Sequence, residues 1–121
     1  MPPADPVELE RLARDSLLAP VPGLNRDDLL RVAAHAAAIS GAAELAAGYA
    51  DLIGPSAPPS HEALLAYAER LTADSVTPDD LAGLRDAGFG TAAIVALSQL
   101  VAFVSYEVRV AAGLRALGGA R

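Results

Sequence analysis

Few side chains in this sequence could carry chemistry, and none of them is a thiol. Cysteine is absent from all 121 residues, so no thiolate is available as a nucleophile or metal ligand. His35 is the most informative titratable residue, because helical spacing puts Asp28 and Arg31 near its side of a helix. A histidine with a carboxylate in reach can act as a general base. The simpler interpretation is a half-buried histidine that bonds to backbone or water.

A second group of polar side chains suggests an anion site. Arg109 follows a long apolar stretch, and with Tyr106 and Tyr49 it could line a pocket for a small anionic ligand. The alternative is structural, with Arg109 paired to a carboxylate on a neighbouring helix or subunit. The remaining histidine, His61, follows a proline-rich linker and is expected to be solvated. Two histidines without ligand spacing predict no metal site.

Composition and charge exclude several classes of partner. Nine arginines and no lysine oppose fifteen acids, and the net charge of −6 argues against nucleic-acid binding. The N-terminus has no basic and apolar segment of a signal peptide. The longest uncharged stretch, 87–106, is interrupted by Gly, Thr, Ser and Gln, so a buried helix is expected rather than a membrane span. These features predict a cytoplasmic protein.

Helix start and stop signals divide the chain into about six helices and no strands. Caps, prolines and glycines predict helices over residues 6–19, 26–40, 43–53, 61–71, 78–87 and 91–117, with a linker at 56–59. In the first helix, Leu9, Leu12 and Leu17 form the apolar side. We therefore predict an all-α bundle over one domain, 1–121.

The last predicted helix is apolar nearly all round from residue 92 to 104. A helix without a polar face must be covered on every side. Five other short helices supply little cover, and large exposed apolar patches are rare on soluble monomers. The helix 91–117 therefore predicts self-association, while a fully covered central helix in a monomer is the alternative.

Five segments of the chain resemble, in order, parts of a known family. They are 61–72 (HEALLAYAERLT), 76–81 (VTPDDL), 84–89 (LRDAGF), 93–95 (AIV) and 103–109 (FVSYEVR). Together they resemble the alkylhydroperoxidase D-like (AhpD-like) proteins, or carboxymuconolactone decarboxylase family, in its peroxidase-related branch. The resemblance covers residues 25–117, whereas 1–24 forms a variable N-terminal helix and linker. It implies a helical bundle that assembles into dimers, trimers or hexamers through its long helices.

The same resemblance implies a lost redox site. Redox members carry Cys-x-x-Cys-x-x-x-His after a glycine, with a glutamate twelve residues before the first cysteine. With Gly41 as that glycine, the cysteine positions hold Ala42 and Leu45, the histidine position Tyr49 and the glutamate position Leu30. Alanine and leucine supply no nucleophile, so we expect no turnover of hydroperoxides with a dithiol donor. No haem-attachment motif or glycine-rich dinucleotide motif points to a substitute cofactor.

Three functions remain open from the sequence. The preferred one is a degenerate family member that acts as an oligomeric binding or assembly protein. The second is a non-redox acid–base enzyme of decarboxylase or isomerase type, with His35 as base and Arg109 or Tyr49 binding an anion. The third is a subunit that co-assembles with a cysteine-bearing relative.

Overall fold

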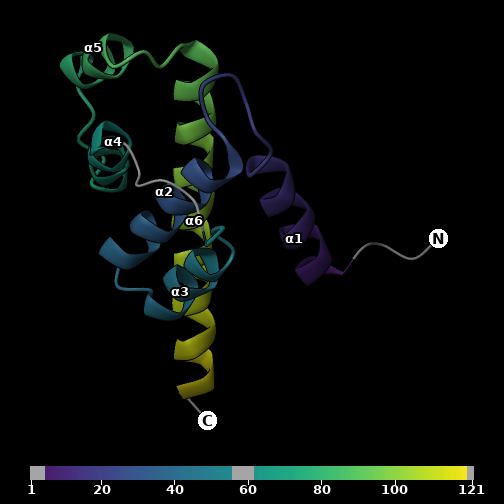
Figure 1. Ribbon diagram of the computed structural model, residues 1–121. Coiled ribbons are helices and arrows are strands. Elements are labelled where there is room, and N and C mark those ends of the chain that lie inside the picture. Colours follow the sequence, from purple (N-terminus) through teal and green to yellow (C-terminus); the bar gives the residue numbers. More distant parts are fainter. Residues whose placement is uncertain (1–4, 56–61, 120–121) are drawn as a thin grey trace.

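The computed structural model describes residues 5–55 and 62–119, which form an all-α protein (Figure 1). Its helices are α1 (Pro6–Leu17), α2 (Arg26–Ile39), α3 (Ala43–Asp51), α4 (Glu62–Thr72), α5 (Pro78–Asp86) and α6 (Thr91–Gly119). The predicted class and number of helices are therefore confirmed. The expected linker at 56–59 and His61 lie outside the described residues.

Local capping sets where the helices begin. The Asn25 side chain accepts a hydrogen bond from the Asp28 backbone N–H (2.8 Å), and the Asp28 carboxylate accepts one from the Asn25 N–H (3.0 Å). Thr77 and Asp80 make the same reciprocal pair at the start of α5. These capping boxes satisfy amide groups that a helix leaves without partners.

Glycine ends two of the helices. Gly41 after α2 and Gly88 after α5 have φ angles of +79° and +98°. Residues with a Cβ rarely adopt this backbone, and glycine adopts it at little cost. The turn at Gly41 folds α3 back against α2, which places the expected redox-site positions in one hairpin.

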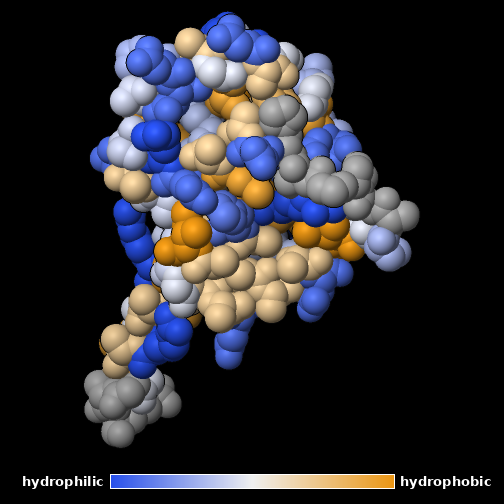
Figure 2. Space-filling model, turned by 60° about the vertical axis from the view of Figure 1, so that its left-hand side comes forward, coloured by the Kyte–Doolittle hydropathy of each residue, from blue (hydrophilic) through white to orange (hydrophobic). Residues whose placement is uncertain are grey.

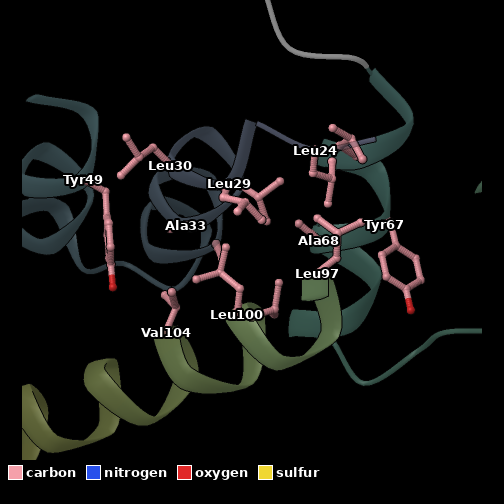
Figure 3. Packing of buried hydrophobic residues seen from close by; sticks show 14 of the residues in the cluster. Leu24, Leu29, Leu30, Ala33, Tyr49, Tyr67, Ala68, Leu97, Leu100 and Val104 are labelled. Atoms are coloured by element: carbon pink, nitrogen blue, oxygen red, sulfur yellow. The ribbon is translucent and has the colours of Figure 1, made fainter. Parts of the chain in front are cut away.

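The core lies between α2 and α6, and α3 and α4 close its sides. Figure 3 shows how the buried apolar side chains of these helices meet. The labelled residues include Leu29, Leu30 and Ala33 of α2, Leu97, Leu100 and Val104 of α6, Tyr49 of α3, and Tyr67 and Ala68 of α4. The buried alanines Ala33, Ala36 and Ala37 on α2 let the helices approach closely.

The apolar side of α1 is not the side that packs on the bundle. Leu9 and Leu12 are 54 % and 49 % exposed, and only Leu17 of the three expected leucines packs on the core. α1 instead meets α6 through the Arg14–Glu107 ion pair, and Leu17 and Leu18 at the end of α1 pack on the core. The amphipathic pattern therefore predicted the helix correctly and its buried side incorrectly.

α6 is the central helix, yet one of its sides is uncovered. Its inner side packs against α2 and α4 and, at fewer positions, α1. Among the described helices it alone is long and apolar enough to cross a membrane, over Thr91–Gly118. Its C-terminal turns extend past α3, at the lower end of the view in Figure 1. The expected excess of apolar surface on this helix is present.

Candidate functional site: a buried carboxylate joining three helices

The described part of the chain buries one charged residue, Glu107, within the apolar helix α6. Glu107 is 4 % exposed. Its Oε2 accepts a hydrogen bond from Nη2 of Arg14 at 2.9 Å, and its Oε1 accepts one from the Tyr49 hydroxyl. Arg14 comes from α1 and Tyr49 from α3. Both carboxylate oxygens therefore have donors, as a buried charge requires.

Arg14 closes this cluster from the outside. Its guanidinium also donates to Glu10, one turn earlier in α1, at 3.3 Å. Its central carbon lies 6.0 Å from the centre of the Tyr49 ring, within range of a cation–π contact. One arginine thus contacts a buried carboxylate, a second carboxylate and an aromatic ring.

Burial governs the protonation of the cluster. Burial raises the pKa of Glu107, although the hydrogen bonds from Tyr49 and Arg14 act in the opposite direction. The pKa of Tyr49 is raised well above its ordinary value, first by burial and then by its hydrogen bond to Glu107. Burial disfavours the charged form of Arg14, but Glu107 outweighs this and raises its pKa. Tyr49 therefore stays protonated and serves as a hydrogen-bond donor rather than as a base.

The four expected redox-site positions fall on α2, α3 and the turn between them, with different surroundings. Leu30 and Ala42 are buried in the core. Leu45 and Tyr49 line a cavity of about 210 Å³ together with Arg14, Glu44, Gly48 and Leu52. A cavity with this lining can hold a small group, but it offers no thiolate or histidine to react with one.

His35 lies at a separate groove between α2 and α3. The groove, of about 610 Å³, is lined by Arg31, Ala34, His35, Ala38, Ala46, Ala47, Ala50, Ile53 and Leu65. His35 Nε2 is 2.8 Å from Oε1 of Glu69 in α4. Asp28, the carboxylate expected from the sequence, instead closes the cap of α2. His35 therefore has a carboxylate partner, but a different one.

Tyr106 and Arg109 are not brought together with Tyr49. Tyr106 is half exposed on the outer side of α6, where its ring lies 6.1 Å from that of Phe103. Arg109 is exposed, and within the described residues it makes no ion pair. Tyr49 and His35 line different cavities, and Arg109 lines neither. The arrangement of Tyr49, His35 and Arg109 around one anion is thus not present.

Glu107 was not among the residues expected at a functional site, although the sequence around it carries a signal. Glu107 is the sole acid between residues 87 and 121, inside an apolar helix, and such a position calls for a buried partner. No comparable signal marks Arg14, which lies 93 residues away. In the described ranges no cluster of three or more His, Asp or Glu side chains could hold a metal ion.

Comparison of the chain with protein-family models, with curated proteins and with solved structures gives no match.

Because only Arg14 of the two arginines Arg11 and Arg14 pairs with buried Glu107, its replacement should cost much more stability. Replacing Arg14 by methionine leaves the Glu107 charge buried with Tyr49 as its remaining donor, which should lower the free energy of unfolding by about 2–3 kcal/mol at pH 7. Arg11→Met is the matched control, because the Glu8 and Asp15 partners of Arg11 are exposed, and it should cost under about 0.5 kcal/mol. Urea unfolding measures both.

The stability that Glu107 contributes depends on pH, and the direction of its pKa shift fixes the sign of that dependence. Because burial raises the pKa of folded Glu107 above its ordinary 4.5, stability from this group is present at low pH and is lost as pH rises from 4.5 through the folded pKa. Arg14→Met raises that folded pKa further, so its deficit should shrink as pH falls toward 4.5. Equal costs for Arg14→Met and Arg11→Met at pH 7 would show that the cluster is not structural.

Proposed function

We propose that this chain is an assembly protein on an alkylhydroperoxidase D-like scaffold, without thiol peroxidase activity. The absence of cysteine supports the loss of that chemistry. The surroundings of Leu45 and Tyr49 agree with it, because Tyr49 is engaged with Glu107 and Arg14 in a structural role. Because Tyr49 has a structural role rather than a catalytic one, self-association is the function with the best support.

The observation that carries the proposal is the uncovered apolar side of α6. Three large side chains on this side are strongly exposed: Val95 by 48 %, Tyr106 by 54 % and Leu117 by 70 %. Leu114, 64 % exposed, lies at its edge, where it borders a groove lined also by residues 41–45. Ala92, Ala102 and Gly113 are exposed between them. Arg109 is the one formal charge on this side of the helix.

The amount of exposed surface fits a stable protein interface. The four large side chains expose roughly 450 Å² per copy, so a pair of copies would bury about 900 Å² before the smaller residues are counted. Specific interfaces bury about 1,200–2,000 Å² in total. The four large side chains thus supply a major part of the apolar area that such an interface needs.

A second copy fits this side of α6 better than a lipid bilayer does. The inner side of the helix is held in the core by α2 and α4, so it cannot leave the bundle without unfolding it. The outer side carries Gln99 and Arg109 in its middle, where hydrocarbon would leave them without partners. The net charge of −6 also disfavours an anionic membrane surface. A cysteine-bearing relative with a similar helix is the alternative protein partner.

A second candidate function rests on the groove at His35. The ring nitrogen of His35 within 2.8 Å of Glu69, beside Arg31 and an apolar floor, is an arrangement suited to acid–base chemistry on a small anionic substrate. Figure 2 shows the wide apolar area on this side of the molecule, to which the alanines of α2 and α3 contribute.

If the chain self-associates through α6, a charge introduced at Val95 should weaken that association. The wild-type chain should have a mass that is a multiple of 12.3 kDa, and Val95→Glu should weaken its self-association at least about tenfold, because a carboxylate would be buried in the interface. Ala82→Glu, on an exposed position of α5, makes a similar charge change and should have no effect. Light scattering coupled to size-exclusion chromatography measures both. A wild type that stays monomeric, or a Val95→Glu protein that associates like wild type, would contradict the proposal.

The acid–base candidate predicts a saturable site for a carboxylate. Amide NMR signals of Ala46, Ala47 and Ala50 should shift and saturate with crotonate and not with its neutral amide, and His35→Gln should weaken binding about tenfold. Glu44→Gln, which changes the other cavity, is the control and should bind crotonate as wild type does. Shifts that never saturate, or that persist unchanged in His35→Gln, would remove this candidate.

A further inference from the structure

We infer that α1 docks on the bundle as a hinged helix, and that its docking is coupled to the uptake of one proton by the carboxyl groups of Glu10 and Glu107, which share Arg14. The structure shows the docked state, in which Glu107 is covered. The contact lies on the inner side of α6, away from the proposed interface between copies.

Charged side chains, rather than apolar ones, hold α1 along most of its length. Between residues 7 and 16, only Glu10 and Arg14 are partly buried, and every other residue is exposed. The exposed residues include Leu9 and Leu12, so burial of apolar surface contributes little to docking over this stretch. A helix of 12 residues is marginal in water by itself, so α1 should open and fray when its contact with α6 breaks.

The chain that follows α1 provides a fixed pivot. Leu18 and Leu24 are 0 % and 2 % exposed and belong to the core. Between them, the backbones of Val21 and Leu24 exchange two hydrogen bonds, of 3.1 and 3.0 Å. The turn is therefore held to the bundle by its own contacts, and the helix before Leu18 can move while the turn stays in place.

Two carboxyl groups share one guanidinium where α1 meets α6. Nη2 of Arg14 lies 2.9 Å from Oε2 of Glu107 and 3.3 Å from Oε1 of Glu10. With both carboxyl groups ionised, two negative charges face one positive charge at a largely buried position. One proton on the pair makes this group of three side chains neutral, which burial favours.

The other side chains around Glu107 supply no second positive charge. From α3, the neutral Tyr49 hydroxyl donates to Oε1 of Glu107, and the carboxyl of Glu44 lines the adjoining cavity beside Arg14. α2 packs on α6 with apolar side chains. On α6 itself, Arg109 lies on the opposite, exposed side of the helix. The second carboxylate therefore has no cation of its own within the cluster.

The sign of the pH dependence follows from these surroundings. Burial raises the pKa of Glu107, the hydrogen bonds from Tyr49 and Arg14 oppose this, and Glu10 raises it further. Release of α1 hydrates Glu107 and brings its pKa back toward the ordinary 4.5. The docked state therefore binds the proton more tightly. Docking is strongest at low pH and weakens as pH rises from 4.5 through the docked pKa, by up to about tenfold per pH unit.

Release of α1 changes what the bundle presents to solvent. Arg14 forms one wall of the cavity of about 210 Å³ beside Tyr49 and Leu45. Removal of this wall widens the cavity and exposes the carboxylate of Glu107. A rise in pH thus opens this side of the bundle, and acid closes it.

Hydrogen exchange measured by NMR tests the coupling, with protection factors that correct for the intrinsic effect of pH on exchange. The amides of residues 10–16 should be at least about threefold less protected at pH 7.5 than at pH 4.5. Glu10→Gln removes the second carboxylate and should raise their protection at pH 7.5 about threefold. Glu8→Gln is the matched control, because Glu8 pairs only with exposed Arg11, and it should not raise protection.

Three outcomes would overturn the inference. Protection of the α1 amides that is the same at both pH values would show that no proton is taken up on docking. Equal protection of these amides and of Leu64 and Ala68 in α4 would show that α1 does not open separately from the bundle. An equal rise in Glu8→Gln and Glu10→Gln would assign the effect to the net charge of α1 rather than to the pair of Glu10 and Glu107.

Discussion

A carboxylate buried in an apolar helix cannot remain charged without donors, and in this protein Glu107 imposes that condition on three helices at once. The Arg14 guanidinium of α1 and the Tyr49 hydroxyl of α3 both meet the Glu107 carboxylate on α6. The interaction joins α1 to α6, and Leu17 and Leu18 at the end of α1 add apolar contacts with the core. Tyr49 lines the cavity beside Arg14 and not the groove at His35. The inner side of α6 is taken up by this cluster and by the core, and its outer apolar side stays exposed.

The cluster of Arg14, Tyr49 and Glu107 gives Tyr49, at one of the expected redox-site positions, a structural role. The family resemblance places Tyr49 at a position that would hold a catalytic histidine, yet here its hydroxyl donates to a structural carboxylate and its ring contacts Arg14. Leu45 adds an apolar wall to the adjoining cavity. Tyr49 therefore takes part in the contact that joins α1 to α6, a structural role at a position where the resemblance implies reactivity.

Features that depend on neighbouring residues could be predicted from the sequence, whereas contacts between distant residues could not. The caps at Asn25 and Thr77 and the glycine at 41 could be predicted because each acts within a few residues. The Arg14–Glu107 pair joins residues 93 apart and His35–Glu69 residues 34 apart, and nothing local identifies either partner. The exposure of Leu9 and Leu12 was mispredicted for the same reason, since the ion pair and not the apolar pattern decides which side of α1 faces α6.

Hydrogen exchange of the unmodified chain tests most directly whether a second copy covers the outer side of α6. Amides of residues 111–117, in the exposed C-terminal turns of α6, should exchange rapidly in dilute protein and become protected as concentration rises roughly a hundredfold. Amides near Leu64 and Ala68 in α4 should keep the same protection throughout, because they lie in the core of each copy. Rapid exchange of residues 111–117 at every concentration would show that no second copy covers α6.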